Sequence, residues 1–207
     1  MNKTSSGADY QYHVGHEAHT DRLLKPHVLR YARESKARSV IDIGCGNGTM
    51  LRELSTVCAQ VVGLDPSVSG INEARKICPA GKFYALGVYD SPSNVEETEF
   101  DLAISTEVVE HLFYPRELVK FAHAKLRKSG MFMVSTPYHG WLKNVAIAVF
   151  NKWDAHHTLF WDGGHIKFWS RATLSKLFEG EGFEVIGFHG CGRAPYLWES
   201  MIIVGRK

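Results

Sequence analysis

The sequence predicts an α/β fold in which a mostly parallel, doubly wound sheet is covered by helices on both faces. The first observation is a regular alternation of short β-branched runs with helical patterns over residues 38–136, the pattern from which parallel sheets are built. The second is that the alternation stops at Pro137 and resumes at Ser170. The 207 residues are enough for one domain of ordinary size.

Each predicted element follows from its local pattern. Apolar residues at helical spacing predict a first helix over residues 21–33 and a second over 47–57. Ser67 is expected to cap a helix that runs to about Ile77. The other helices are expected at 115–128, which Pro115 suits as a first-turn residue, at 145–150, and at 171–179 after Ser170. Strands are expected at residues 39–43, 61–65, 82–86, 100–105, 130–136, 183–188 and 196–204.

Composition excludes several classes of protein. Lys and Arg together number 24 and Asp and Glu 22, which is too even a balance for an obvious nucleic-acid partner. No apolar run is long enough to span a bilayer, and we expect no secretory signal at the N-terminus. The four cysteines form no C-x-x-C pair, so we expect neither a disulfide scaffold nor a zinc site, and a cytoplasmic location.

A glycine-rich loop follows the first predicted strand. Residues 42–49 read DIGCGNGT, and glycines there let the backbone approach a ligand closely at the start of a helix. Thr49 stands where a dinucleotide fingerprint needs its third glycine, and no phosphate-loop lysine follows. Asp65 ends the second strand, and an acid there can accept hydrogen bonds from both ribose hydroxyls of an adenosine-containing ligand.

The segments at residues 40–48 (VIDIGCGNG) and 63–67 (GLDPS) resemble the class I S-adenosylmethionine-dependent methyltransferases. The resemblance covers residues 38–136. It implies a Rossmann-like, seven-stranded sheet whose last strand is antiparallel.

For the cofactor, the resemblance implies that Gly44 and Gly46 lie against the methionine portion of S-adenosylmethionine. Asp42 would hold the ammonium group and Asp65 the ribose. Further cofactor contacts are implied for Pro66, Val88, Tyr89 and Ser105.

Glu107, Glu110 and His111 form an E-x-x-E-H run after the fourth strand. If Thr106 caps a short helix, the three side chains share one face and make a partial shell for a divalent cation. Alternatively, the glutamates only complement the positive end of that helix. His165 supplies another imidazole where the chain returns to the sheet, which favours the metal interpretation.

The E-x-x-E-H run and a later G-x-H-x-x-F element resemble two branches of this family, the ubiquinone-biosynthesis O-methyltransferases and the small-RNA 2′-O-methyltransferases. In the RNA branch, the matching positions bind a magnesium-type ion beside the acceptor hydroxyl. The resemblance therefore implies a divalent metal held by Glu107, Glu110, His111 and His165. Because two imidazoles are softer ligands than Mg²⁺ usually prefers, manganese, iron and cobalt stay open.

The chemistry of methyl transfer favours an oxygen acceptor. Transfer from a sulfonium is an in-line displacement, so an attacking hydroxyl must be nearly unprotonated, and a divalent ion lowers its pKa. An amine already carries a lone pair and needs no metal. We therefore expect an enzyme that methylates a hydroxyl of a small molecule, catechol-like or a sugar-like vicinal diol.

Three alternatives remain open. The first is 2′-O-methylation of RNA, against which the near-neutral charge and the lack of an appended RNA-binding domain count. The second is a metal-independent methyltransferase in which His165 is the general base. The third is a module that binds cofactor or a partner without catalysis, against which the intact glycine loop and E-x-x-E-H run count.

The chain divides into four parts within one methyltransferase domain: an N-terminal arm and helix (1–37), a cofactor-binding core (38–136), an aromatic and histidine-rich insertion (137–169) and a C-terminal helix and strand pair (170–207). We expect the insertion, with the segment from Tyr10 to His19, to form a lid over the acceptor pocket. The aromatic residues concerned are Trp141, Phe150, Trp153, Phe160, Trp161 and Trp169. His156 and His157 are left without an assigned role.

Overall fold

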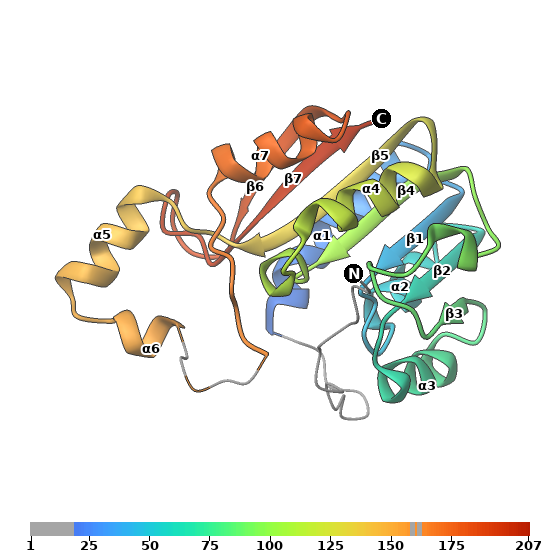
Figure 1. Cartoon of the computed structure of the whole chain (residues 1–207), viewed down its shortest axis with the longest axis horizontal. Coiled ribbons are helices and arrows are strands. Elements are labelled where there is room, and N and C mark those ends of the chain that lie inside the picture. The colour runs from blue at the N-terminus through green and yellow to red at the C-terminus, as the bar shows by residue number, and fades with distance from the viewer. Residues whose placement is uncertain (1–18, 158–159, 161–162) are drawn as a thin grey trace.

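The computed structural model describes residues 19–157, 160 and 163–207, so the segment from Tyr10 to Ala18 and Trp161 lie outside the described residues. Within them lies a seven-stranded sheet in the order β3-β2-β1-β4-β5-β7-β6 (Figure 1). Neighbouring strands from β3 to β5 pair in parallel, and β7 is antiparallel to both of its neighbours, β5 and β6. The mostly parallel sheet with an antiparallel last strand is as predicted. The strands are β1 (Ser39–Ile43), β2 (Gln60–Leu64), β3 (Lys82–Tyr84), β4 (Phe100–Thr106), β5 (Leu126–Pro137), β6 (Glu184–Cys191) and β7 (Ser200–Arg206).

Helices cover both faces of this sheet, and each face has its own apolar core. One core joins α1 (His19–Glu34), α2 (Thr49–Leu54) and α3 (Val68–Ile77) to the sheet. The other joins α4 (Pro115–Lys125) and α7 (Arg171–Gly180) to the opposite face. Two 3₁₀ turns, η1 (Pro92–Asn94) and η2 (Val109–His111), lie between β3 and α4. Because β1 to β5 run parallel, the residues that follow β1, β2 and β4 meet at one edge.

Most predicted elements differ from the observed ones by a few residues at their ends, and two of these differences have a clear physical cause. The predicted helix over residues 115–128 ends at Lys125, and Leu126 already pairs with Phe100 in the sheet. Lys207 closes this helix end, because its ammonium group donates to the carbonyl oxygens of His123 and Leu126, each at 2.6 Å. The last strand begins at Ser200 rather than 196, since Tyr196 has a left-handed φ of 65° that a strand does not adopt.

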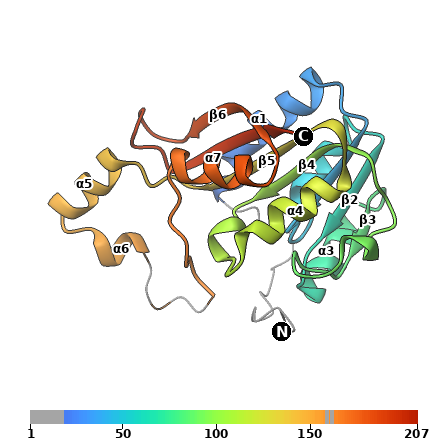
Figure 2. The same cartoon turned by 45° about the horizontal axis from the view of Figure 1, so that its top comes forward.

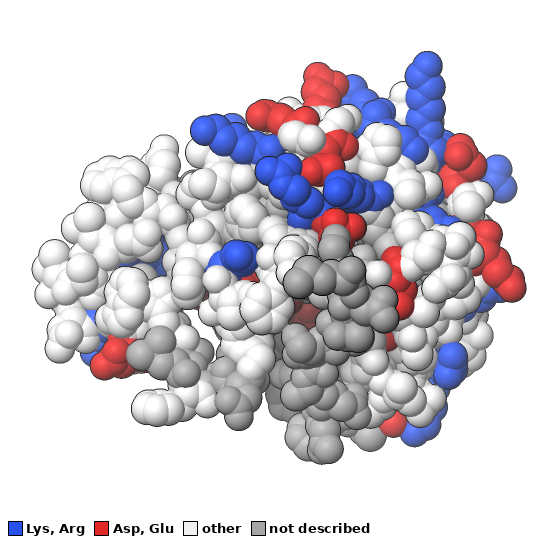
Figure 3. Space-filling view, in the orientation of Figure 1, with Lys and Arg blue, Asp and Glu red and all other residues white. Residues whose placement is uncertain are grey.

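The insertion after β5 forms an arm of two short helices, α5 (Trp141–Val149) and α6 (Trp153–His157), which projects away from the sheet (Figures 1 and 2). In Figure 3 this arm shows few charged side chains, whereas the sheet and its helices are densely charged. Several large apolar side chains of the arm are exposed: Trp141, Val145, Val149, Phe150, Trp153 and Phe160. None of the helices in the described ranges has the length and apolarity needed to cross a bilayer.

Asp101 joins the starts of three neighbouring strands. Its carboxylate accepts hydrogen bonds from the backbone N–H groups of Arg38 and Ser39 at 2.8 and 3.0 Å, and from Arg127 Nε at 2.7 Å. Partial burial alone would raise the pKa of Asp101, but these hydrogen bonds hold it below its usual value. The ionised carboxylate therefore stabilises the fold.

Replacing Asp101 with Asn should lower the free energy of unfolding by about 1–3 kcal/mol at neutral pH, because charge-assisted hydrogen bonds are lost. Since the pKa of Asp101 is depressed in the folded state, its contribution is present above the unfolded pKa of about 3.9 and disappears as the pH falls through the lower folded value. Urea unfolding at stepwise lower pH should show the two proteins converging. Glu179→Gln, at an exposed acid of α7, is the matched control and should change little; a constant difference at every pH would contradict the prediction.

Candidate active site

The glycine loop between β1 and α2 has the backbone that only glycine adopts without strain. Gly44, Gly46 and Gly48 have left-handed φ values of 90°, 51° and 75°. The N–H groups of Gly44 and Cys45 both donate to the carbonyl of Leu64, which joins the loop to the end of β2. A Cβ on Gly44 would collide with the side chain of Val108, in the turn after β4. The loop therefore lies directly against the segment that carries the E-x-x-E-H run.

Asp65 lies at the end of β2, as predicted, and it shapes the loop. Its carboxylate accepts hydrogen bonds from the N–H groups of Gly46 at 2.9 Å and Ser67 at 2.8 Å. Ser67 in turn caps α3 by accepting a hydrogen bond from Gly70 N–H, as predicted. A carboxylate has about four lone-pair sites, more than these two bonds occupy.

Asp42 is the most unusual buried group of the site. It is 1% exposed, and neither of its carboxylate oxygens has a hydrogen-bond partner among the described residues. Burial raises its pKa well above the usual range, and the neighbouring carboxylates of Asp21 and Asp65 raise it further. Buried carboxylates without partners are costly. An ammonium group of a ligand is the kind of partner that this arrangement lacks.

The other predicted cofactor residues lie around the same edge of the sheet. Val88 is buried and Tyr89 half-buried in the segment after β3, whereas Pro66 is exposed. The Tyr89 hydroxyl accepts a hydrogen bond from Tyr114 N–H at 3.2 Å. Ser105 is fully buried and its hydroxyl donates to the carbonyl of Ile43 at 2.7 Å. Ser105 therefore ties the ends of β1 and β4 together.

The E-x-x-E-H run does not form the short helix that the sequence predicts. β4 continues through Thr106, Glu107 has a left-handed φ of 56°, and only Val109–His111 make a 3₁₀ turn. Thr106 is therefore not a helix cap. The reason is that sheet pairing extends to Thr106, and the next N–H, of Glu107, donates to Ser135 instead of starting a helix.

This turn separates the two glutamates. The Glu107 carboxylate accepts hydrogen bonds from the hydroxyls of Ser135 and Ser200, each at 2.8 Å, and Glu110 accepts one from Thr136 at 3.0 Å. Ser135 and Thr136 are consecutive residues of β5, whose side chains point to opposite faces of the sheet. The two carboxylates are consequently held on different sides of the strand end.

Glu110, His111 and His165 come together. Ligand atoms of all three lie within 4.8 Å of one another, and Glu107 is outside this group. His165 Nε2 is 3.9 Å from Glu110 Oε1, a buried oxygen that accepts no hydrogen bond from any of the described residues. Three of the four residues that the resemblance implied as metal ligands are thus close enough to share one ion.

Backbone contacts orient this group. Ile166 and Lys167 both donate their N–H groups to the carbonyl of Glu110, at 2.9 and 3.0 Å. His111 Nδ1 lies 2.8 Å from the carbonyl oxygen of Gly163. A carbonyl partner holds the proton on Nδ1, so Nε2 is the nitrogen with the lone pair, as in many metal-binding histidines.

The electrostatics of the group favour a cation. Burial, followed by the neighbouring Glu107, raises the pKa of Glu110 well above its usual range. Burial, followed by His111, lowers the pKa of His165 to about 4. The group therefore offers a divalent ion a neutral imidazole and a carboxylate that lacks a compensating charge.

Sequence reasoning missed two groups beside this site. His139 is buried, with its ring centroid 5.6 and 5.8 Å from those of His156 and His157. Lys143, on α5, is near Glu107, and burial followed by Arg193 lowers its pKa to about 8. His139 could have been found, because it follows β5 at the edge where ligands bind; Lys143 could not, because only the fold of the insertion brings it there.

Comparisons with known proteins bear on the family and on the fold. A family model described as a methyltransferase domain matches residues 16–187. The ubiquinone biosynthesis O-methyltransferase of Bradyrhizobium diazoefficiens is 36% identical over 126 residues, which cover 59% of this chain and 47% of that protein. The protein of the same name from Nitrobacter winogradskyi is 30% identical over 165 residues, covering 76% of this chain and 60% of that protein. The chain thus spans about half the length of these relatives.

Solved structures share the fold. A putative methyltransferase of Bacillus halodurans has a TM-score of 0.70 at 15% identity, covering 88% of this chain and 97% of the other. The N-methyltransferase NodS of Bradyrhizobium japonicum, solved with S-adenosyl-L-homocysteine, has a TM-score of 0.67 at 15% identity, covering 92% and 88% of the two chains.

Asp42→Asn should make the ligand-free protein more stable, by about 1–3 kcal/mol near neutral pH, because it removes a buried charge that has no partner. Since the pKa of Asp42 is raised in the folded state, the wild-type protein loses stability as the pH rises above the unfolded value of about 3.9. Thermal unfolding at several pH values should give equal unfolding temperatures for the two proteins in acid and a higher unfolding temperature for the variant at neutral pH. The exposed Asp154 offers the control Asp154→Asn; a less stable Asp42→Asn variant would refute this account of the site.

Proposed function

The chain belongs to the class I S-adenosylmethionine-dependent methyltransferases, and from that premise we propose that it transfers a methyl group from S-adenosylmethionine to a hydroxyl group of a small molecule, assisted by a divalent metal ion. One observation carries the proposal. The side chains of Glu110, His111 and His165 converge in the segment after β4, next to the glycine loop that Gly44 brings against Val108.

The glycine loop and Asp42 support the cofactor. Asp42 would pair with the ammonium group of S-adenosylmethionine, which supplies the positive charge that its two buried oxygens lack. Asp65 would accept from the ribose hydroxyls while it holds the loop through Gly46. The adenosine side of the site would be formed by Pro66, Val88 and Tyr89. Ser105 would keep the ends of β1 and β4 in position through its hydrogen bond to the carbonyl of Ile43.

Glu110, His111 and His165 would hold the metal ion. When bound, the ion would lower the pKa of the acceptor hydroxyl and stabilise the developing oxyanion. Glu110 brings one negative charge to the site, and the Gly163 carbonyl keeps His111 in the tautomer that can ligate. We assign Glu107 a supporting role, because its carboxylate is held by Ser135 and Ser200 outside the group of three.

The acceptor is proposed to carry adjacent hydroxyls, as in a catechol or a sugar-like diol. Three protein donors do not complete the shell of a six-coordinate ion such as Mg²⁺, so two neighbouring oxygens of the acceptor could add to it. Relatives named as O-methyltransferases support oxygen as the methylated atom.

The insertion would cover the acceptor. His156 and His157 of α6 are close enough to His165 to contribute to its lowered pKa, which supports a position of α6 beside the proposed metal ligands. All four cysteines are free and buried, which fits the cytoplasm as the proposed compartment.

Glu110→Gln should abolish binding of Mg²⁺ or Mn²⁺ and lower turnover by about 100-fold or more, since even outer-shell changes at metal sites cost 10–100-fold. Affinity for S-adenosylmethionine should stay within about two-fold, because the side chain that contacts Gly44 in the glycine loop is Val108 rather than Glu110. Calorimetry with each ion and formation of S-adenosylhomocysteine with catechol as acceptor measure the two effects. Glu107→Gln is the matched control and should keep metal binding; equal loss in both variants would restore Glu107 as a ligand, and unchanged turnover in Glu110→Gln would end the metal proposal.

Exhaustive chelation should abolish methyl transfer to catechol, and addition of Mg²⁺, Mn²⁺ or Co²⁺ should restore it. The ion that restores the highest activity is the one that a site with two imidazole ligands prefers. Full activity of the chelated protein would assign His165 as a general base in a metal-independent reaction.

A further inference from the structure

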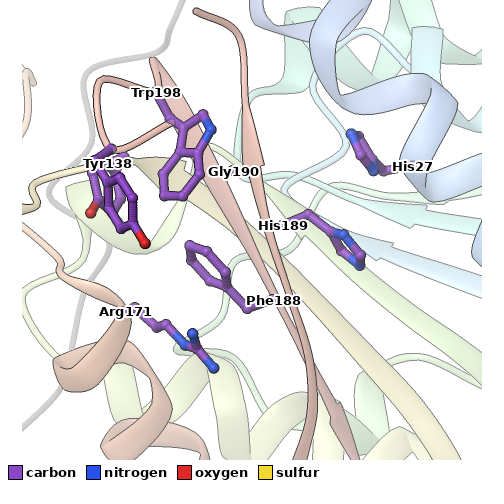
Figure 4. A pocket seen from close by; sticks show the side chains of 8 residues that line it. His27, Tyr138, Arg171, Phe188, His189, Gly190 and Trp198 are labelled. Carbon is purple, nitrogen blue, oxygen red and sulfur yellow. The ribbon is translucent and has the colours of Figure 1, made fainter. Parts of the chain in front are cut away.

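A cavity of about 420 Å³ lies beside the edge strand β6, outside the site described above (Figure 4). Its walls come from β6, from the loop before β7, from Tyr138 after β5 and from Arg171, the first residue of α7. None of its lining residues, all within the described part of the chain, is acidic. The volume is in the range of small-molecule sites, roughly 300–1,000 Å³.

One wall of the cavity is aromatic and is centred on Trp198. The Trp198 ring meets Tyr138 and Phe188 edge-on, with centroids 5.1 and 5.5 Å apart. A Cβ on Gly190 would collide with the Trp198 ring, so the indole lies directly on the backbone of β6. Edge-on contacts of this kind hold the rings in fixed positions, which leaves a rigid surface for another planar ring.

The cationic group of the cavity is Arg171. Its guanidinium carbon lies 4.7 Å from the centroid of the Phe188 ring, and no carboxylate of the described residues forms an ion pair with it, in contrast to Arg116 and Arg127. A guanidinium stacked on a ring keeps its N–H donors in a planar fork that matches a carboxylate or phosphate. Figure 4 shows Arg171, Phe188, Tyr138 and Trp198 on one side of β6, with His27 and His189 on the other. Arg171 is therefore the residue on this side of β6 that can hold the anionic group of a ligand.

We propose that this cavity is a second ligand site, which binds a small planar aromatic ring bearing a carboxylate or phosphate group. The ring packs against the wall formed by Trp198, Tyr138 and Phe188, and the anionic group accepts hydrogen bonds from Arg171. None of the residues that line the cavity belongs to the group of Glu110, His111 and His165.

Titration calorimetry on the full chain, without cofactor or metal, tests the proposal with four probes. Benzoate and phenyl phosphate carry both features, inorganic phosphate lacks the ring and benzyl alcohol lacks the charge. At least one of the first two should bind, and the last two should bind about ten-fold more weakly or not at all, since a charge-assisted hydrogen bond contributes roughly a factor of ten or more. The stronger of benzoate and phenyl phosphate identifies the preferred anion.

Variants locate the binding. Arg171→Gln should weaken the better probe by about ten-fold or more, while Arg171→Lys retains part of the affinity. Lys176→Gln, at an exposed cation of the same helix, and Glu110→Gln should leave it unchanged.

Three results would overturn the proposal: no binding of benzoate or phenyl phosphate at millimolar concentration, binding that Arg171→Gln leaves intact, or binding that Glu110→Gln removes. Because neither cofactor nor metal is present in the assay, these failures leave the proposed methyl transfer standing, and a failure of that activity would leave this site standing.

Discussion

The close approach of Gly44 to Val108 is the contact on which the candidate site depends. No side chain fits between the first loop and the turn after β4, so two segments more than sixty residues apart in sequence become neighbours at one edge of the sheet. Ser105 reinforces the contact through its hydrogen bond to Ile43. Cofactor residues and candidate metal ligands can therefore serve one reaction only while this contact is kept.

Charge is distributed across the two sides of that contact in different ways. On the cofactor side, Asp42 is buried without a hydrogen-bond partner among the described residues, and Asp65 accepts hydrogen bonds from the N–H groups of Gly46 and Ser67. On the other side, Glu110 is buried with one oxygen unpaired, next to two imidazoles. Both sides are thus negative or neutral at their centres, and each is suited to a positively charged ligand of a different kind.

Much of this architecture could be predicted from sequence, since a mostly parallel, seven-stranded sheet with an antiparallel last strand follows from the alternation of patterns and the family resemblance. Local sequence patterns predict the wrong secondary structure where pairing with a strand distant in sequence determines it. Thr106 looks like a helix cap, but pairing with Ser135 keeps it in β4, and that pairing also separates Glu107 from Glu110. Likewise, the end of α4 is fixed by Lys207, which lies 81 residues beyond Leu126 in the sequence and donates to its carbonyl oxygen. Lys143 enters the site only through the fold of the insertion, because it lies on α5.

The two N–H groups of Ile166 and Lys167 that bind the Glu110 carbonyl have a consequence for substitutions at these two positions. Because these bonds involve only main-chain atoms of the returning segment, they do not depend on which side chains stand there. Substitution of the side chains at positions 166 and 167 can therefore leave the returning segment attached to the Glu110 backbone.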